Sequence, residues 1–131
     1  MHIMRKTLLA VLLLHAPLAV SQDDDSDKQR ARDRAAYFLD LTSKAAREVC
    51  SKHIKNYGAS FDAAYPAWLQ ANKDSVVRGR DETIYMLRRN GSIEAYEAEA
   101  IAAFGEQFAL LQKDRKKTRC LGILNAFGAS Q

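Results

Sequence analysis

Histidine and cysteine, the side chains that hold most protein-bound zinc, are scarce in this chain. Its 131 residues include three histidines and two cysteines, and His2 and His15 lie in the N-terminal segment. A structural zinc site needs four ligands, most of them of these two types. The CxxCH run that attaches c-type haem is absent. We therefore expect no metal and no cofactor.

Catalytic motifs are also lacking. A Ser-His-Asp or Cys-His triad would depend on His53, the remaining histidine, which we expect to be a partly exposed structural residue. A pair of carboxylates can hydrolyse glycosides, and 16 acidic residues are present, but those that can be placed fall on outer helix faces. We expect no catalytic residues and no enzyme, and we keep a hydrolase with paired carboxylates as the third functional alternative.

Long apolar runs are missing except near the N-terminus. The run Leu8–Leu14 is too short for a membrane-spanning helix, which needs about 20 residues, and Arg5 and Lys6 precede it. Cations, a short apolar core and then small residues form the pattern of a secretory signal peptide. Residues 1–21 are therefore predicted to be removed on export, which predicts a soluble mature protein in the periplasm or outside the cell.

The cleavage point stays open between Ala19 and Ser21. Removal of the signal peptide takes away two cations and leaves 18 basic against 16 acidic residues, a net charge of +2 instead of +4. The basic character of the whole chain is therefore partly a property of the signal peptide.

Both cysteines, Cys50 and Cys120, follow the predicted signal peptide. An even number of cysteines in an oxidising compartment favours a disulfide over metal ligation. Such a bond would tie the first helix of the domain to the last and stabilise the fold by roughly 4–5 kcal/mol in the chain-entropy model. The alternative is a pair of buried, inert thiols.

The spacing of apolar residues predicts helices along the rest of the chain and no strands. Residues 22–27 carry four aspartates and no apolar side chain, so we expect an acidic flexible tail. A first helix is predicted over residues 28–56. Gly58 is expected to end it in the left-handed conformation.

A second helix is predicted over residues 60–78, with Ser60 as its N-cap. Pro66 either starts this helix or bends it, because proline is tolerated in the first turn and costly in the interior. We favour a bend. The helical pattern continues over residues 81–90, either as a separate helix or as the second half of one long element with a weak middle at Gly79.

Ser92 is the expected cap of the next helix, whose apolar stripe reaches Leu111. Thr118 is the expected cap of a short last helix that ends at Gly128. The fold class is therefore all-α. Residues 28–131 are predicted to form a single domain, an up-and-down bundle of about four helices plus a short C-terminal helix.

Two groups of cations and two aromatic residues are candidates for a partner-binding surface. Clustered cations attract an acidic partner, whereas export argues against nucleic acid. Core packing and solvation are the competing interpretation for every member. The candidates are Tyr65, Trp68, Arg78, Arg80, Arg88, Arg89, Lys113, Arg115, Lys116 and Lys117.

The chain resembles a loose set of small, uncharacterised exported helical proteins of Gram-negative bacteria. The positions that carry the resemblance are Cys50, Ala64, Trp68, Asn72 and Cys120. The resemblance covers most of the mature chain, implies a disulfide-tied periplasmic bundle and transfers no catalytic role. Pro66 departs from the pattern and leaves the start of the second helix open.

Our first functional hypothesis is a non-enzymatic binding protein of the cell envelope. Export, small size, a disulfide-tied helical scaffold and the lack of catalytic motifs motivate it. An inhibitor or immunity-type partner of another envelope protein is the form that we consider first. The alternative is a helical bundle that carries a small ligand between its helices.

Overall fold

The computed structural model describes the backbone of residues 16–129 and the side chains of residues 24–129. The chain divides into two compact units, Met1–Arg32 and Asp33–Gln131. Most of the predicted signal peptide, residues 1–21, lies outside the described residues, so its cleavage stays a prediction. Within the described part, no helix is long and apolar enough to cross a membrane.

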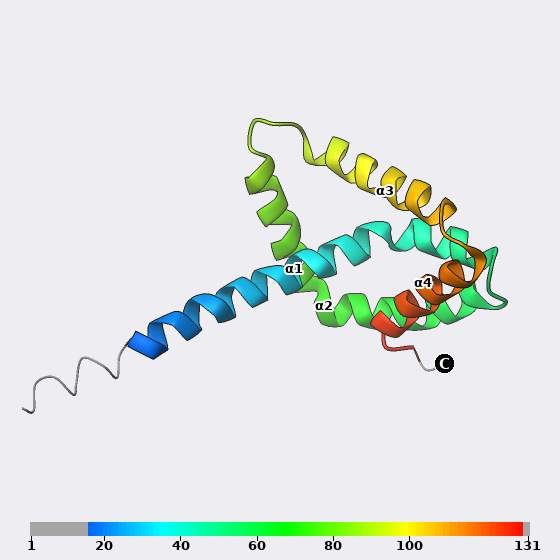
Figure 1. Ribbon diagram of the computed structural model, residues 1–131, viewed down its shortest axis with the longest axis horizontal. Helices are drawn as coiled ribbons and strands as arrows, with labels where there is room; N and C mark the ends of the chain where they lie inside the picture. The colour runs from blue at the N-terminus through cyan, green and yellow to red at the C-terminus, as the bar shows by residue number, and fades with distance from the viewer. Residues whose placement is uncertain (1–15, 130–131) are drawn as a thin grey trace, which may run out of the picture. The chain divides into compact units, whose positions relative to one another are not determined.

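Four helices account for most of the described residues, and none of these residues lies in a strand. The helices are α1 (Ala16–Ser51), α2 (Tyr57–Leu87), α3 (Ile93–Ala109) and α4 (Lys113–Ala126) (Figure 1). The all-α prediction is confirmed. The structure has four helices where about four plus a short fifth were expected, because the two segments predicted between residues 60 and 90 form one helix.

The first unit contains the start of α1. The acidic segment 22–27, expected as a flexible tail, is helical there. Its aspartates pair with cations about one turn later, Asp24 with Lys28 at 2.7 Å and Asp27 with Arg30. Pairs at these spacings stabilise a helix by about 0.2–0.5 kcal/mol each, which favours the helix although the segment has no apolar side chain.

In the second unit, α1 ends at Ser51, earlier than predicted, and a short turn leads into α2. Asn56 takes the left-handed conformation in this turn, with φ at 61°, which asparagine tolerates better than most residues. The prediction that Gly58 ends the first helix is therefore wrong. Tyr57 and Gly58 open α2 instead, and Ser60 lies inside this helix rather than at its cap.

α2 is one continuous helix that contains both Pro66 and Gly79. Of the two arrangements predicted for this stretch, the single long element is confirmed. Pro66 lies inside the helix and does not start it. Thr83, one turn after Gly79, donates its hydroxyl to the Gly79 carbonyl at 2.9 Å, and the helix continues through this segment without a break.

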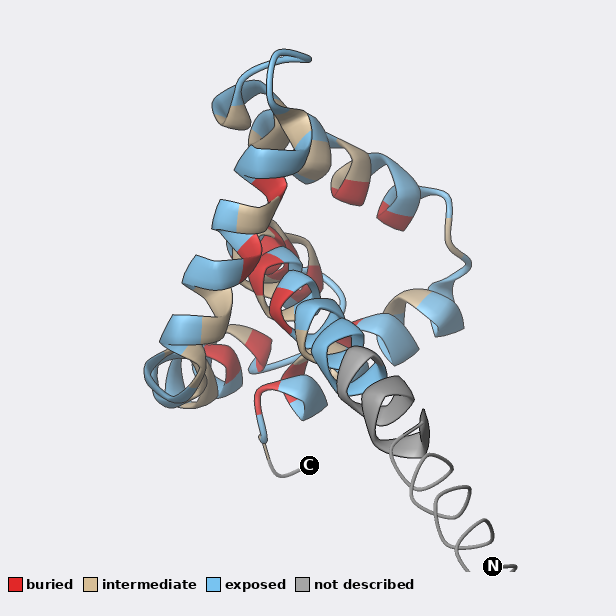
Figure 2. Cartoon of the chain, turned by 90° about the vertical axis from the view of Figure 1, so that its left-hand side faces the viewer, coloured by how far each residue is buried: buried red, intermediate tan, exposed pale blue. Residues whose placement is uncertain are grey.

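The core of the second unit surrounds a disulfide. Cys50 at the end of α1 and Cys120 in α4 are fully buried and bonded, with an S–S distance of 2.06 Å. The predicted link between the first and last helices is confirmed. Figure 1 shows α3 running from the far end of α2 back toward the end of α1, and Figure 2 shows the buried positions concentrated on particular faces of the helices. The buried neighbours of the disulfide are Tyr57, Phe61, Phe108, Leu124 and Phe127.

Ser92 caps α3 as predicted, because its side chain accepts a hydrogen bond from the backbone N–H of Ala95 at 3.1 Å. The cap predicted at Thr118 is wrong. α4 already begins at Lys113, and the Thr118 hydroxyl donates to the carbonyl of Asp114 at 3.0 Å. The basic run that was expected to precede the last helix therefore forms its first turns.

The C-terminus of α4 closes with the hydrogen-bond pattern of a Schellman motif. Gly128 has a positive φ of 79°, and its N–H donates to the carbonyl of Asn125 at 2.9 Å. The N–H of Ala129 donates to the carbonyl of Leu124 at 3.0 Å. The predicted helix end at Gly128 is confirmed.

Candidate functional site

The first half of α4 carries a group of cations with no ion-pair partner among the described residues. We call it the α4 cation face, and its members are Lys113, Arg115, Lys116, Lys117 and Arg119. Asp114 is the single acidic residue of this helix. Four other arginines of the second unit are bound to carboxylates at 2.7–2.9 Å, whereas Arg88 and Arg89 form no ion pair with the described residues. These pairs are Arg34–Glu82, Arg47–Asp62, Arg78–Asp33 and Arg80–Glu97.

The location of the cations in the first turn of α4 is electrostatically unfavourable. The N-terminus of a helix behaves as roughly half a positive charge, and a cation there costs about 0.3–1 kcal/mol at an exposed position. Lys113 is the first residue of α4, and Gln112 before it makes no side-chain cap. The ammonium of Lys116 lies 5.8 Å from the ring centre of Phe108. Positive charge is therefore concentrated where a bound anion would lower the electrostatic free energy.

Two shallow hollows flank the α4 cation face. The first has a volume of about 290 Å³ and is lined by His53, Lys113, Asp114 and Lys117. The second has a volume of about 420 Å³ and is lined by Leu111, Arg115, Thr118 and Arg119. His53 is exposed beside the first hollow, with its ring centre 5.6 Å from that of Phe108. The α4 cation face is thus a positively charged surface with two hollows.

The first predicted group of cations has a different environment. Arg78 makes two hydrogen bonds to the carboxylate of Asp33, at 2.9 and 3.0 Å, and the Asp33 side chain is only 6 % exposed. Arg80 donates to Glu97 at 2.8 Å. Burial, together with the negative charge of Glu97, raises the pKa of Tyr37 to about 12. Arg78 joins α2 to α1 and Arg80 joins α2 to α3, so both have a structural role.

The end of α2 presents the other two arginines of this group. The guanidinium of Arg88 lies 4.6 Å from the ring centre of Tyr85 and donates to its hydroxyl at 2.7 Å. Arg89 is exposed. Tyr85 and Met86 beside them are 66 % and 63 % exposed. This segment is accessible, but its charges are fewer than those of the α4 cation face.

The two aromatic candidates pack against the core. The rings of Tyr65 and Trp68 lie 5.3 and 5.1 Å from the ring of Phe127, measured between centroids, and both side chains are half-buried. The hydroxyl of Tyr65 donates to the carboxylate of Asp40. Asn72 donates to the carbonyl of Trp68 at 2.8 Å, within its own helix. These contacts give Tyr65 and Trp68 a packing role.

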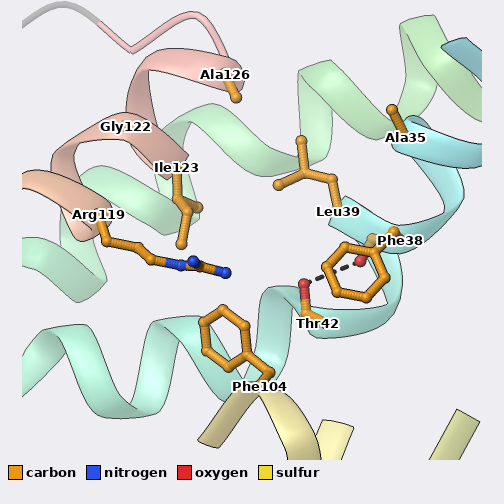
Figure 3. A pocket seen from close by; sticks show the side chains of 9 residues that line it. All are labelled: Ala35, Phe38, Leu39, Thr42, Phe104, Arg119, Gly122, Ile123 and Ala126. Atoms are coloured by element: carbon orange, nitrogen blue, oxygen red, sulfur yellow. Dashed lines mark hydrogen bonds between the residues drawn. The ribbon is translucent and has the colours of Figure 1, made fainter. Parts of the chain in front are cut away.

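A separate apolar hollow lies between α1, α3 and α4, and we call it the α1/α3/α4 groove (Figure 3). Its volume is about 410 Å³. α1 contributes Ala35, Phe38, Leu39 and Thr42; α3 contributes Phe104; and α4 contributes Arg119, Gly122, Ile123 and Ala126. No pattern in the sequence alone predicts this groove. The pattern that could indicate the groove is a spacing of i, i+3, i+4 and i+7 among its lining residues on both α1 and α4. This pattern indicates a groove only when the two helices are known to face each other.

Few side chains in the described part of the chain are placed to bind a metal ion or to act in acid–base catalysis. No group of three His, Cys, Asp or Glu side chains that could hold a metal ion occurs among the residues whose side chains are described. Asp33 and Glu97, two of the less exposed acids, are both engaged by arginines. The arrangement can therefore bind charged or apolar groups at its surface, and these two carboxylates serve to hold helices together.

The chain matches no protein-family model, no curated protein and no solved structure at a significant level. The resemblance to small exported helical proteins therefore stays an expectation from the sequence.

Proposed function

We propose that this protein is a non-enzymatic binding protein of the cell envelope that attaches to an acidic surface of another protein. The contact surface is the α4 cation face, and an inhibitor or immunity-type partner is the form of activity that we favour. The observation that carries the proposal is the contrast in charge pairing. Four arginines of the second unit are bound to carboxylates, whereas the cations of α4 are left without an acidic partner among the described residues.

The position of these cations supports the same conclusion. Lys113, Arg115 and Lys116 lie in the first turn of α4, at the positive end of the helix, where a cation adds an unfavourable term to the folding free energy. Carboxylates of a partner would reverse the sign of that term and would add charge-assisted hydrogen bonds. Complementary charge also raises the rate of association, because it steers the two proteins before contact.

The scaffold suits a contact surface that does not rearrange. Cys120 lies in the same helix as the cations, one residue after Arg119, and its disulfide fixes this part of α4 to the end of α1. A surface held in place before binding loses little conformational entropy on association. Export, which the N-terminal sequence predicts, would place this surface in the envelope.

A capture experiment with the mature, oxidised chain tests the proposal. The immobilised protein is expected to recover one stoichiometric partner from an envelope extract, and salt should release it because charge contacts are screened. The triple variant Lys113→Gln, Lys116→Gln, Lys117→Gln should fail to recover it. A soluble acidic protein recovered in this way would then be titrated in purified form.

The matched control is the triple variant Lys44→Gln, Lys55→Gln, Lys73→Gln. It removes the same number of charges of the same type from exposed positions outside α4. It should capture the partner as the unmodified protein does. Equal capture by both triple variants would contradict the proposal, and so would the absence of any partner across growth conditions.

A further inference from the structure

The α1/α3/α4 groove lies apart from the lysines of the α4 cation face and has a different chemistry. Its walls are apolar, and Phe104 at its side is only 4 % exposed whereas Phe38 is 43 % exposed. The hydroxyl of Thr42 donates to the carbonyl of Phe38 at 2.9 Å, so this polar side chain is already satisfied. Arg119 is then the one charged residue that lines the groove.

The groove is lined along one face of α1 and one face of α4. On α1 and on α4 its lining residues follow the spacing i, i+3, i+4 and i+7, which places them along one face over about 10 Å of each helix at 1.5 Å per residue. Ala35 on one side and Gly122 and Ala126 on the other are too small to fill the space between the helices. Apolar residues that continue along two helices in this way offer contact to a linear acyl chain.

Arg119 supplies the chemistry for one end of such a chain. Figure 3 shows its side chain reaching from α4 toward α1, between Ile123 and Phe104. Its guanidinium lies 5.3 Å from the ring centre of Phe104, and no carboxylate of the described residues forms an ion pair with it. A planar guanidinium binds carboxylates and phosphates through paired hydrogen bonds.

We propose that the α1/α3/α4 groove binds the acyl chain of an anionic amphiphile, with the anionic headgroup at Arg119. The chain lies along Gly122 and Ile123 toward Ala126. The volume of about 410 Å³ is within the range usual for small-molecule sites, about 300–1,000 Å³. Both a free fatty acid and a lysophospholipid with an anionic headgroup have this chemistry. This site goes beyond the proposed contact with an acidic protein: it shares Arg119 with the α4 cation face, but it is argued from the lining of the groove and does not require that contact.

Calorimetric titration of the mature, oxidised chain tests the ligand class. Laurate is expected to bind saturably and one-to-one below its micelle-forming concentration, and dodecyltrimethylammonium, with the same chain and the opposite charge, at least about tenfold more weakly. Lysophosphatidylglycerol is titrated in parallel, and the tighter of the two anionic ligands identifies the source. Equal binding of the cationic amphiphile, or no saturable binding of either anion, would overturn the proposal.

Two glycine variants test the location. A Cβ at Gly122 would meet no heavy atom within 4 Å, and the same is true at Gly105 on α3, which does not line the groove. Gly122→Leu should therefore fold, occupy the groove and weaken laurate binding by about tenfold or more. Gly105→Leu is the matched control and should bind laurate normally. Unchanged binding by Gly122→Leu would refute the location.

Two further variants test the orientation of the chain. Arg119→Gln should remove the preference for laurate over the cationic amphiphile while retaining apolar binding. Ala126→Leu, at the opposite end of the groove, should weaken laurate more than the shorter octanoate. If Arg119→Gln keeps the full preference, the headgroup is not at Arg119 and this part of the proposal is wrong.

Discussion

Gly79 of α2 lies directly against the backbone of α1 at Asp33. A Cβ placed on Gly79 would stand 2.2 Å from the carbonyl oxygen of Asp33 and 2.8 Å from the Cβ of Tyr37. Real Cβ atoms do not approach a backbone oxygen so closely, so the two helices can cross here only because Gly79 has no side chain. The carboxylate of Asp33 accepts two hydrogen bonds from Arg78 of α2, so the same two helices are also joined by an ion pair at this crossing.

Gly79→Ala should therefore destabilise the second unit. Alanine favours a helix over glycine by about 0.8–1 kcal/mol, but overpacking at a backbone contact costs about 1–3 kcal/mol or more, so the clash should outweigh the gain. The measurement is the midpoint of urea unfolding. Gly105→Ala, at a helical glycine with open space around it, should be neutral or stabilising. A variant at Gly79 as stable as that control would show that the helices do not cross at this distance.

The disulfide gives a second prediction. Cys50→Ser and the double change Cys50→Ser, Cys120→Ser should destabilise the fold by a similar amount, roughly 4–5 kcal/mol, because both remove one bond that closes a long loop. Reduction of the unmodified protein should lower its stability to a similar level. Urea unfolding with and without reductant measures all three. If reduction leaves the unfolding midpoint unchanged, the bond does not carry this stability.

Tyr57 gives a prediction for alkaline pH. Burial raises its pKa to about 12, above the value of about 10 expected in the unfolded chain. As the pH rises, the unfolded chain therefore loses the Tyr57 proton before the folded protein does. The contribution of the protonated Tyr57 to the free energy of unfolding is fully present below about pH 10 and is lost as the pH rises toward 12. The measurement is the free energy of unfolding as a function of pH.

The variant Tyr57→Phe isolates this contribution. It removes the hydrogen bond from the Tyr57 hydroxyl to the carbonyl of Cys120, so stability at neutral pH should fall by about 1 kcal/mol. Its stability should then decline less steeply above pH 10 than that of the unmodified protein. Tyr85→Phe, at an exposed ring, is the control. An equal alkaline decline in Tyr57→Phe and the unmodified protein would rule out this residue as a source.

Lys113→Glu tests how much a cation at the start of α4 lowers the stability of the protein. It replaces a cation by an anion at the first position of the helix, so the protein should become more stable by about 0.3–1 kcal/mol at low salt, and the gain should shrink in high salt. Lys73→Glu, exposed near the middle of α2, should show no such gain. Loss of stability in Lys113→Glu would mean that the helix end is not positively polarised as argued.

Part of the architecture was predictable from local sequence. Ser92 was identified as a cap because a short polar side chain before an apolar stripe satisfies a free backbone N–H, and this needs no distant contact. Gly128 was identified as a helix end because only glycine adopts positive φ freely. The cysteine pair followed from its even count and from the oxidising compartment that the N-terminal sequence predicts. In each case a few neighbouring residues or the chemistry of one residue type decided the outcome.

Other features were mispredicted because two local interpretations were equally good. Gly58 and Asn56 can both take a left-handed conformation, and the structure uses Asn56. Thr118 is a plausible cap, but α4 extends back to Lys113. The aspartates of residues 22–27 lack apolar neighbours, yet pairing with cations about one turn away suits a helix. Local propensities differ too little at such positions to select one arrangement.

The sequence by itself determined the helical class, the single disulfide and the two groups of cations, because periodicity, residue counts and charge are properties of the chain. Only the tertiary structure decided which cations are available. Arg78 and Arg80 meet Asp33 and Glu97 from other helices, whereas the cations of α4 meet no carboxylate in the described part of the chain. The α1/α3/α4 groove likewise exists only where helices distant in sequence face each other. Charge pairing and cavities depend on distances between helices, and the order of residues along the chain does not contain those distances.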